Sequence, residues 1–255
     1  MWLQSVLGFL YFLIDTLPSL LWRWGVAWLL TLIVLIYSFH WIKPHIRPHA
    51  FRVDDRVRAW ARGFRFKGHV DSPRERIALT WFFRFWTNLA SAPSLSLLSL
   101  IVPFGLYWHQ LGAFLNVTQT GTATHLQSVR VWLLPGLCYF GSMFMSYVTK
   151  RVFKRLRPPI EKGAFGHKLT RDPSFPSGHS LTSFCFWIPM AIALALAGGS
   201  VGAVVSMALV AVTIVALTGL SRIYMAVHYP SDVVGGYTIG LVWCLTCYLA
   251  LRGAL

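Results

Sequence analysis

Twelve residues from Ser221 to Asp232 form a polar segment between two long apolar stretches. The segment contains Arg222, His228 and Asp232, and the only other charged residue after position 181 is Arg252. A neutral, correctly oriented histidine can act as a nucleophile toward phosphorus. A carboxylate bonded to one ring nitrogen fixes the tautomer and leaves the other nitrogen free to attack. The residue types in this segment therefore fit phosphoryl transfer.

The spacing of His228 and Asp232 leaves two ways for them to pair. They are four residues apart with Pro230 between them, so the carboxylate reaches the ring through a turn or from the start of the next helix. A plainer interpretation also stands: a short interfacial loop with a helix cap at Ser231 and polar side chains that extend toward the head groups.

A second group of residues could hold a phosphoryl group. Lys150, Lys154 and Arg157 are spaced i, i+4 and i+7, so a continuing helix would carry them on one face until Pro158 ends it. Arginine can bind phosphate oxygens in a bidentate manner, and lysine adds a point charge. Basic residues at a helix C-terminus also favour the helix dipole or bind lipid head groups, which is the alternative interpretation.

A third group precedes another apolar stretch and reads Pro176-Ser177-Gly178-His179. A helix N-terminus has unpaired N–H groups and a positive dipole end, so it is suited to bind an anion. Gly178 lets the backbone approach a ligand, Ser177 can cap the helix or donate a hydrogen bond, and His179 stands at the mouth of this site. The alternative is an ordinary Ser-Gly cap with an incidental histidine.

The composition indicates the elements that must position these groups. The chain has 255 residues, of which 56% are hydrophobic and 12% are charged, and several apolar runs are long enough to cross a bilayer as helices. We therefore predict an all-α, polytopic integral membrane protein: a six-helix transmembrane bundle with interfacial helices. The expected spans are residues 24–42, 85–109, 131–149, 180–198, 201–220 and 233–251.

Three regions follow from this pattern. Residues 1–42 comprise the first span and an N-terminal segment (1–21) that is interfacial, re-entrant or an extra span. Residues 43–84 form a basic linker with eleven Lys or Arg, which is either amphipathic helices on the membrane surface or a solvated linker. Residues 85–255 form the core that contains the polar motifs of residues 150–232.

Counting spans from the third onward places the three polar motifs on the same side of the membrane. The net charge of +15 resides in segments that flank spans, which favours lipid head groups or a phosphorylated substrate over nucleic acid as partners. The four cysteines all lie in apolar runs, so we interpret them as packing residues rather than a metal or redox site. They are Cys138, Cys185, Cys244 and Cys247.

Together the motifs resemble a known family. Lys-x6-Arg-Pro, Pro-Ser-Gly-His and Ser-Arg-x5-His-x3-Asp, in this order, are similar to the three-part signature of the type 2 phosphatidic acid phosphatases. Their superfamily includes bacterial acid phosphatases, glucose-6-phosphatase and vanadium haloperoxidases. The matching positions are Lys150, Arg157, Pro158, Pro176, Ser177, Gly178, His179, Ser221, Arg222, His228 and Asp232.

The resemblance implies a role for each matching residue. His228 would attack phosphorus to give a phosphohistidine, Asp232 would orient it, and His179 would protonate the leaving oxygen and then activate water. The equatorial oxygens would be held by cations and by amides of the second motif, namely Lys150, Arg157, Arg222, Ser177 and Gly178. Because the expected face offers no acidic cluster suited to Mg²⁺, we expect no metal and no other cofactor.

The predicted function is hydrolysis of a lipid phosphate monoester or diphosphate at the membrane interface. Candidate substrates are phosphatidic acid, phosphatidylglycerol phosphate, a polyprenyl diphosphate and a phosphorylated glycolipid. A lipid phosphotransferase with the same site is the nearest alternative, and an anion transporter is a more distant one. The resemblance favours the outer face of a bacterial-type inner (plasma) membrane, whereas 20 of 23 basic residues on the catalytic side favour the cytoplasmic face. The sequence leaves the oligomeric state open.

Overall fold

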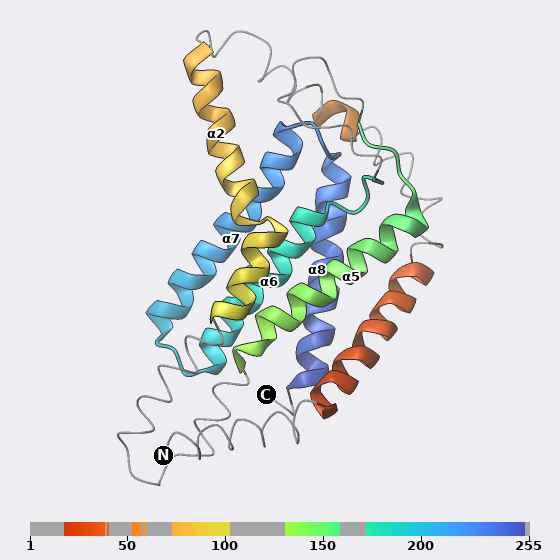
Figure 1. Cartoon of the computed structure of the whole chain (residues 1–255), viewed down its shortest axis with the longest axis vertical. Coiled ribbons are helices and arrows are strands. Elements are labelled where there is room, and N and C mark those ends of the chain that lie inside the picture. The colour runs from red at the N-terminus through yellow and green to blue at the C-terminus, as the bar shows by residue number, and fades with distance from the viewer. Residues whose placement is uncertain are drawn as a thin grey trace.

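A computed structural model describes the chain over residues 18–38, 40, 53–57, 59, 73–102, 131–158 and 172–252, without the side chains of 73–78. The residues between the second and third predicted spans and most of the basic linker lie outside these ranges, as do residues 1–17. Every regular element in the described part is a helix (Figure 1). The prediction of an all-helical integral membrane protein is confirmed.

Four long helices form the core of the bundle: α5 (Leu133–Phe153), α6 (Gly178–Leu196), α7 (Val201–Tyr224) and α8 (Pro230–Leu251). Helix α6 packs against all three others, and α2 (Pro73–Leu89) packs on α7. Gly236 of α8 sits against the first turn of α6, where an added Cβ would lie 3.0 Å from the Ser177 carbonyl oxygen and 3.2 Å from the Leu181 nitrogen. This close approach joins the ends of α6 and α8.

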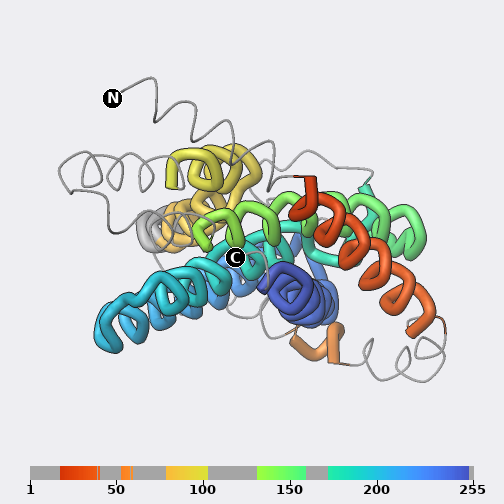
Figure 2. The backbone as a smooth tube through the Cα atoms, turned by 90° about the horizontal axis from the view of Figure 1, so that it is seen from below, coloured from red at the N-terminus to blue at the C-terminus, as the bar shows by residue number. Residues whose placement is uncertain are grey.

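The first span begins earlier than predicted, as a helix over Pro18–Ser38 rather than 24–42. Pro18 opens this helix, a position where its missing N–H is no loss. The helix lies along the outer side of the bundle, across from α7 (Figure 2). Its indole N–H groups dock on α5: Trp24 donates to the Leu137 carbonyl (3.0 Å) and Trp28 to the Gly141 carbonyl (2.9 Å). These bonds satisfy polar groups that an apolar surrounding would leave unpaired.

The predicted span at 85–109 is broken where the structure describes it. Leu79–Leu89 and Ala92–Val102 are two helices that meet at an angle of 47°. The break lies just before Pro93, whose missing N–H and bulky ring oppose a continuous helix. Near the break, the hydroxyls of Thr87 and Ser221 are 2.7 Å apart, which ties α2 to the end of α7.

The count of six spans is not confirmed. Four described helices are long and apolar enough to cross a membrane, or five if the bent pair is one span, and α5 is not among them. Polar residues of α5, including Ser142, Ser146 and Lys150, lower its hydropathy. The spans predicted from 180, 201 and 233 correspond to α6, α7 and α8, with ends that differ by up to four residues.

Candidate active site

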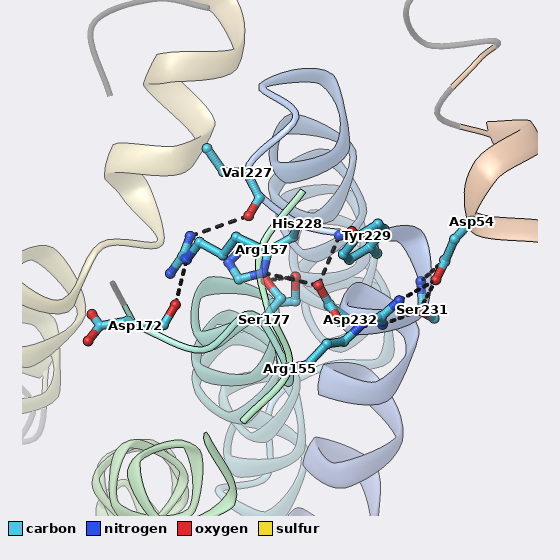
Figure 3. A network of polar contacts seen from close by, with 11 residues as sticks. Asp54, Arg155, Arg157, Asp172, Ser177, Val227, His228, Tyr229, Ser231 and Asp232 are labelled. Carbon is cyan, nitrogen blue, oxygen red and sulfur yellow. Dashed lines mark hydrogen bonds and ion pairs between the residues drawn. The ribbon is translucent and has the colours of Figure 1, made fainter. Parts of the chain in front are cut away.

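The three polar motifs meet at one end of the bundle (Figure 3). The Ser177 N–H donates to the Asp232 carbonyl oxygen (3.0 Å), which joins the second motif to the third. The guanidinium of Arg157 donates to the Val227 carbonyl oxygen (3.3 Å), which joins the first motif to the third. Main-chain and side-chain hydrogen bonds therefore bring together residues that are up to 70 positions apart in the sequence.

His228 and Asp232 form the buried centre of the site. His228 lies in the connection between α7 and α8 with 2% of its surface exposed, and Asp232 is fully buried in the first turn of α8. Pro230 is the first residue of α8, so the proline predicted to separate the pair instead starts the helix that carries the carboxylate. His228 Nδ1 lies 3.5 Å from Asp232 Oδ2, which is longer than a hydrogen bond. Catalytic contacts of this kind often tighten when a substrate binds.

The environment of His228 keeps its imidazole neutral. Burial lowers the pKa of His228 to about 4; the Asp232 carboxylate opposes this shift, and the positive charges of Arg222 and Arg157 add to it. A histidine with this pKa has an unprotonated ring nitrogen at neutral pH. His228 thus meets the first requirement for a nucleophile, which is a free lone pair.

The second motif opens α6 as predicted, with Ser177 at the N-cap and His179 in the first turn. The Ser177 hydroxyl does not cap the helix; it accepts a hydrogen bond from the Ser180 hydroxyl (2.9 Å). The first amides of α6 therefore have no cap from the side chain at its N-terminus. His179 is half-buried in this first turn.

Three cations surround this centre. Lys150 is half-buried in the last turn of α5, and Arg222 is 6% exposed in the last turn of α7. Arg222 Nε is buried and has no hydrogen-bond partner among the described residues. Arg157 Nε donates to the Asp172 carbonyl oxygen (3.0 Å), and burial lowers the pKa of its guanidinium. A buried guanidinium with an unused N–H is suited to bind an anion.

The predicted helical face of Lys150, Lys154 and Arg157 is wrong. Helix α5 ends at Phe153, because Lys154 adopts a left-handed conformation with φ 45°. Lys154 is exposed, and a non-helical segment of four residues then carries Arg157 back to the site. The motif therefore works through a helix end and a return of the chain, not through one continuous helix.

Sequence reasoning missed three residues that contact the buried carboxylate or its partners: Asp54, Arg155 and Tyr229. Ser231, which the sequence suggested only as a helix cap, contacts Asp54 and Arg155 as well. Arg155 donates to Asp232 Oδ1 (2.7 Å) and to Asp54 Oδ2 (2.7 Å), so it lies between two carboxylates (Figure 3). The Tyr229 N–H donates to Asp232 Oδ2 (2.9 Å). The available signals were weak: Arg155 was one of several basic residues, and Asp54 lies about 100 positions away in the basic linker.

No group of three His, Cys, Asp or Glu side chains within the described ranges is arranged to hold a metal ion. The four cysteines are buried without disulfides in α5, α6 and α8. This arrangement agrees with their predicted role in packing.

Comparison with known proteins finds a family match for the second half of the chain. Residues 131–254 match the model of the PAP2 superfamily. These residues form a PAP2 domain. The domain begins at α5 and ends just after α8, so it includes all three motifs. The Pro18–Ser38 helix, the described part of the basic linker and α2 lie before it.

Individual proteins are similar to part of this chain. Phosphatidylglycerophosphatase B of Bacillus subtilis is 31% identical over 112 residues, which cover 42% of this chain and 51% of that protein. Decaprenylphosphoryl-5-phosphoribose phosphatase of Mycobacterium tuberculosis is 32% identical over 111 residues, or 44% of this chain and 56% of that protein. The chain thus spans about half the length of the curated relatives it matches.

A crystal structure extends the likeness of the fold beyond the PAP2 domain. The transmembrane PAP2 type phosphatidylglycerolphosphate phosphatase from Bacillus subtilis superposes with a TM-score of 0.61 at 20% identity. The superposition covers 89% of this chain and 96% of the other. At this identity the likeness concerns the fold alone.

Proposed function

We propose that the protein is an integral-membrane lipid phosphatase that hydrolyses a phosphate monoester or diphosphate through a phosphohistidine. The observation that carries this proposal is the buried, neutral His228, which has a carboxylate on one side and cations on the other. The carboxylate orients the ring for attack on phosphorus. The cations balance the negative charge of the phosphoryl group.

In the first step His228 Nε2 attacks phosphorus, and the bond from phosphorus to the lipid oxygen breaks. Asp232 favours the tautomer with the proton on Nδ1, and it stabilises the positive charge that the ring acquires. His179 donates a proton to the departing oxygen, so the lipid leaves as an alcohol, or as a phosphate ester if the substrate is a diphosphate.

In the second step water replaces His228 on phosphorus. The now neutral His179 takes a proton from the water as its oxygen attacks, the P–N bond breaks, and inorganic phosphate leaves. Both histidines return to their starting states. One residue thus acts as acid and then as base.

The cations and the start of α6 bind the phosphoryl oxygens in both steps. Arg222, with its unused Nε, and Arg157 and Lys150 supply positive charge, and the first amides of α6 supply hydrogen bonds. A phosphoryl group that spreads its charge over three equatorial oxygens in the transition state benefits from this arrangement.

The proposed substrate class is a lipid with a terminal phosphate. The polar motifs stand at the ends of apolar helices, where a head group can enter while the tails stay in the bilayer. The names of the two relatives describe phosphatases of lipid-linked phosphates, which supports this class. Phosphatidylglycerol phosphate, phosphatidic acid, a polyprenyl diphosphate and a phosphorylated glycolipid are the candidates.

The decisive test is phosphate release from a panel of these lipids by the purified protein, with His228→Asn as the control. We expect release from at least one lipid by the parent protein and none by the variant. Release of free phosphate distinguishes hydrolysis from transfer to a second lipid. An anion transporter would bind or move phosphate without cleaving it, and a peripheral histidine would not be required.

We also propose that the reaction needs no metal ion. Excess EDTA should leave the rate unchanged. Loss of activity with EDTA and its return with Mg²⁺ would contradict the proposed mechanism. The side of the membrane that the site faces can be determined with single cysteines and an impermeant thiol reagent in a cysteine-free background.

A further inference from the structure

A short helical segment of the basic linker, residues 53–57, contacts the catalytic end of the bundle. Within it Asp54 is 1% exposed, whereas the adjacent Asp55 is exposed. A buried carboxylate is costly unless it is paired and hydrogen-bonded. The partners that Asp54 finds are therefore a guide to what it does.

The Asp54 carboxylate has two sets of partners. Its Oδ2 receives the guanidinium of Arg155 at 2.7 Å and the hydroxyl of Ser231 at 2.5 Å. Its Oδ1 accepts a hydrogen bond from the Ser231 N–H at 2.8 Å. Ser231 is the second residue of α8, and its N–H is one that a helix leaves unpaired. Asp54 thus caps α8 from a distant part of the chain.

Both sets of partners lead to Asp232. Arg155 Nη1 donates to Asp232 Oδ1 and to the Ser231 hydroxyl, each at 2.7 Å (Figure 3). Asp232 follows Ser231 in the first turn of α8. Arg155 also lies over the ring of Tyr229, 4.1 Å from its centroid. The guanidinium is therefore fixed from several directions, and the carboxylate that it contacts is fixed with it.

We propose that Asp54 is a positioning residue for the catalytic pair and acts through Arg155 and the first turn of α8. In this arrangement Asp54 balances the positive charge of Arg155. The negative charge of Asp232 is therefore not neutralised by Arg155 and can act on His228. Without Asp54, Arg155 becomes an unbalanced cation beside Asp232, and the start of α8 loses its cap. The linker is then part of the active site, although it lies outside the PAP2 domain at residues 131–254.

The direct consequence is a fixed tautomer of His228. A correctly placed Asp232 favours the proton on Nδ1 and leaves Nε2 free. If Asp54 is removed, Asp232 is held less firmly, and His228 should populate both neutral tautomers. This signature is specific, because a general loss of stability does not by itself change the tautomer of one folded histidine.

The test compares Asp54→Asn with Asp55→Asn, which removes the same charge one residue away at an exposed position. The sample is the purified full chain in detergent, labelled with ¹⁵N-histidine, at neutral pH. Signals of His228 are assigned by their loss in His228→Asn, since the chain has nine histidines. We expect the Nδ1–H tautomer in the parent and in Asp55→Asn, and a mixture in Asp54→Asn. Identical spectra for Asp54→Asn and the parent would overturn the proposal.

A kinetic comparison tests the route through Arg155. Asp54→Asn should lower kcat about tenfold with little change in KM, because groups in one polar network couple by this order of magnitude. In an Arg155→Gln background the same substitution should have an effect of only about twofold or less. An equal loss in both backgrounds would show that Asp54 does not act through Arg155.

Two further controls keep the outcome decisive. If Asp54→Asn does not fold, Arg155→Gln replaces it, because it removes the cation that joins Asp54 to Asp232. A parent-like tautomer of His228 and a parent-like kcat in Arg155→Gln would then overturn the proposal. The kinetic part rests on the proposed phosphatase activity, but the tautomer needs no substrate. A parent protein that releases no phosphate would contradict the proposed function and still leave the role of Asp54 decided by the spectra.

Discussion

The two sides of His228 differ in how fully their polar groups are paired. On the carboxylate side, Asp232 accepts hydrogen bonds from Arg155 and from the Tyr229 N–H, and Arg155 is paired in turn with Asp54. On the cationic side, Arg222 has a buried Nε with no partner among the described residues, and Arg157 donates to main-chain carbonyls. The carboxylate oxygens on one side are thus paired with donors of the protein itself, whereas the Arg222 Nε on the other side is not.

This difference indicates that the carboxylate side supports His228 and that the cationic side binds the substrate. Buried polar groups are nearly always hydrogen-bonded, so a buried guanidinium nitrogen without a partner needs an explanation. An oxygen of a bound phosphoryl group would accept the hydrogen bond that this nitrogen can donate. On the carboxylate side, in contrast, Asp232 and Asp54 already accept hydrogen bonds from protein donors, so this side serves to hold the imidazole. Substitutions on the two sides should therefore fail in different ways.

After loss of the nucleophile itself, the largest effect is expected from His179→Ala, which removes the proposed acid. Phosphoenzyme formation from a lipid substrate should slow by about 10²–10⁴-fold, because an alkoxide leaves poorly without a proton. The loss should shrink for p-nitrophenyl phosphate, whose leaving group needs little protonation. Rapid-quench kinetics on both substrates measure the difference, with His40→Ala at an exposed position as the control. Equal losses on the two substrates would rule out His179 as the acid.

Arg222→Gln should have the next largest effect, because it removes the buried cation with the unused nitrogen. We expect kcat/KM to fall by about 10²–10³-fold, the range for loss of one donor to a transition-state oxygen. Arg252→Gln changes an exposed arginine in the same half of the chain and should leave the rate unchanged. If both variants kept the parent rate, the cationic side would not bind the phosphoryl group.

A pH titration tests the electrostatic balance between the two sides. Because the pKa of His228 is lowered to about 4, the imidazole should stay neutral from pH 7 down to about pH 4. The fraction of active nucleophile then falls about tenfold for each pH unit below that point. The ¹⁵N signals of His228 report its protonation directly. A titration midpoint of His228 near pH 6.5 would contradict this account. It would mean that burial and the nearby cations do not lower the pKa of His228.

The smallest effect on the rate is expected from Gly236→Ala, which disturbs the contact between the two ends. The added Cβ would press on the backbone at Ser177 and Leu181, which cannot move aside as a flexible side chain could. We expect a loss of about 1–3 kcal/mol in the free energy of unfolding and a rate several-fold lower. Gly202→Ala, where nothing lies within 4 Å, serves as the control in thermal melts. Equal melting temperatures would indicate that the two helices are not held this closely.

The sequence predicted the long apolar helices and the polar motifs best. The apolar runs predicted α6, α7 and α8 to within four residues, and the motifs predicted which segments would meet. The helix ends were less predictable: Lys154 stops α5 by a left-handed conformation, which a lysine rarely adopts and which no local pattern indicates. The bend before Pro93 is the converse case, because its cause is visible in the sequence although its angle is not.

The supporting side of the site could not be predicted for a physical reason. The contact between Asp54 and Arg155 joins residues 101 positions apart, and neither residue lies in a periodic pattern that would place it. Within the motif region, Arg155 looked like one more basic residue near a membrane. Long-range polar pairs depend on how the helices pack, and that packing is known only from the structure.

The central claim is that His228 carries the phosphoryl group, and the most direct measurement is to trap that intermediate. The protein is mixed with a ³²P-labelled substrate, quenched within milliseconds and digested, and the labelled peptide is identified. The account predicts an acid-labile, base-stable phosphohistidine at His228 that is absent from His228→Ala and accumulates in His179→Ala on an activated substrate. A phosphohistidine that forms in His228→Ala, with none in His179→Ala, would contradict the account and reverse the roles of the two histidines.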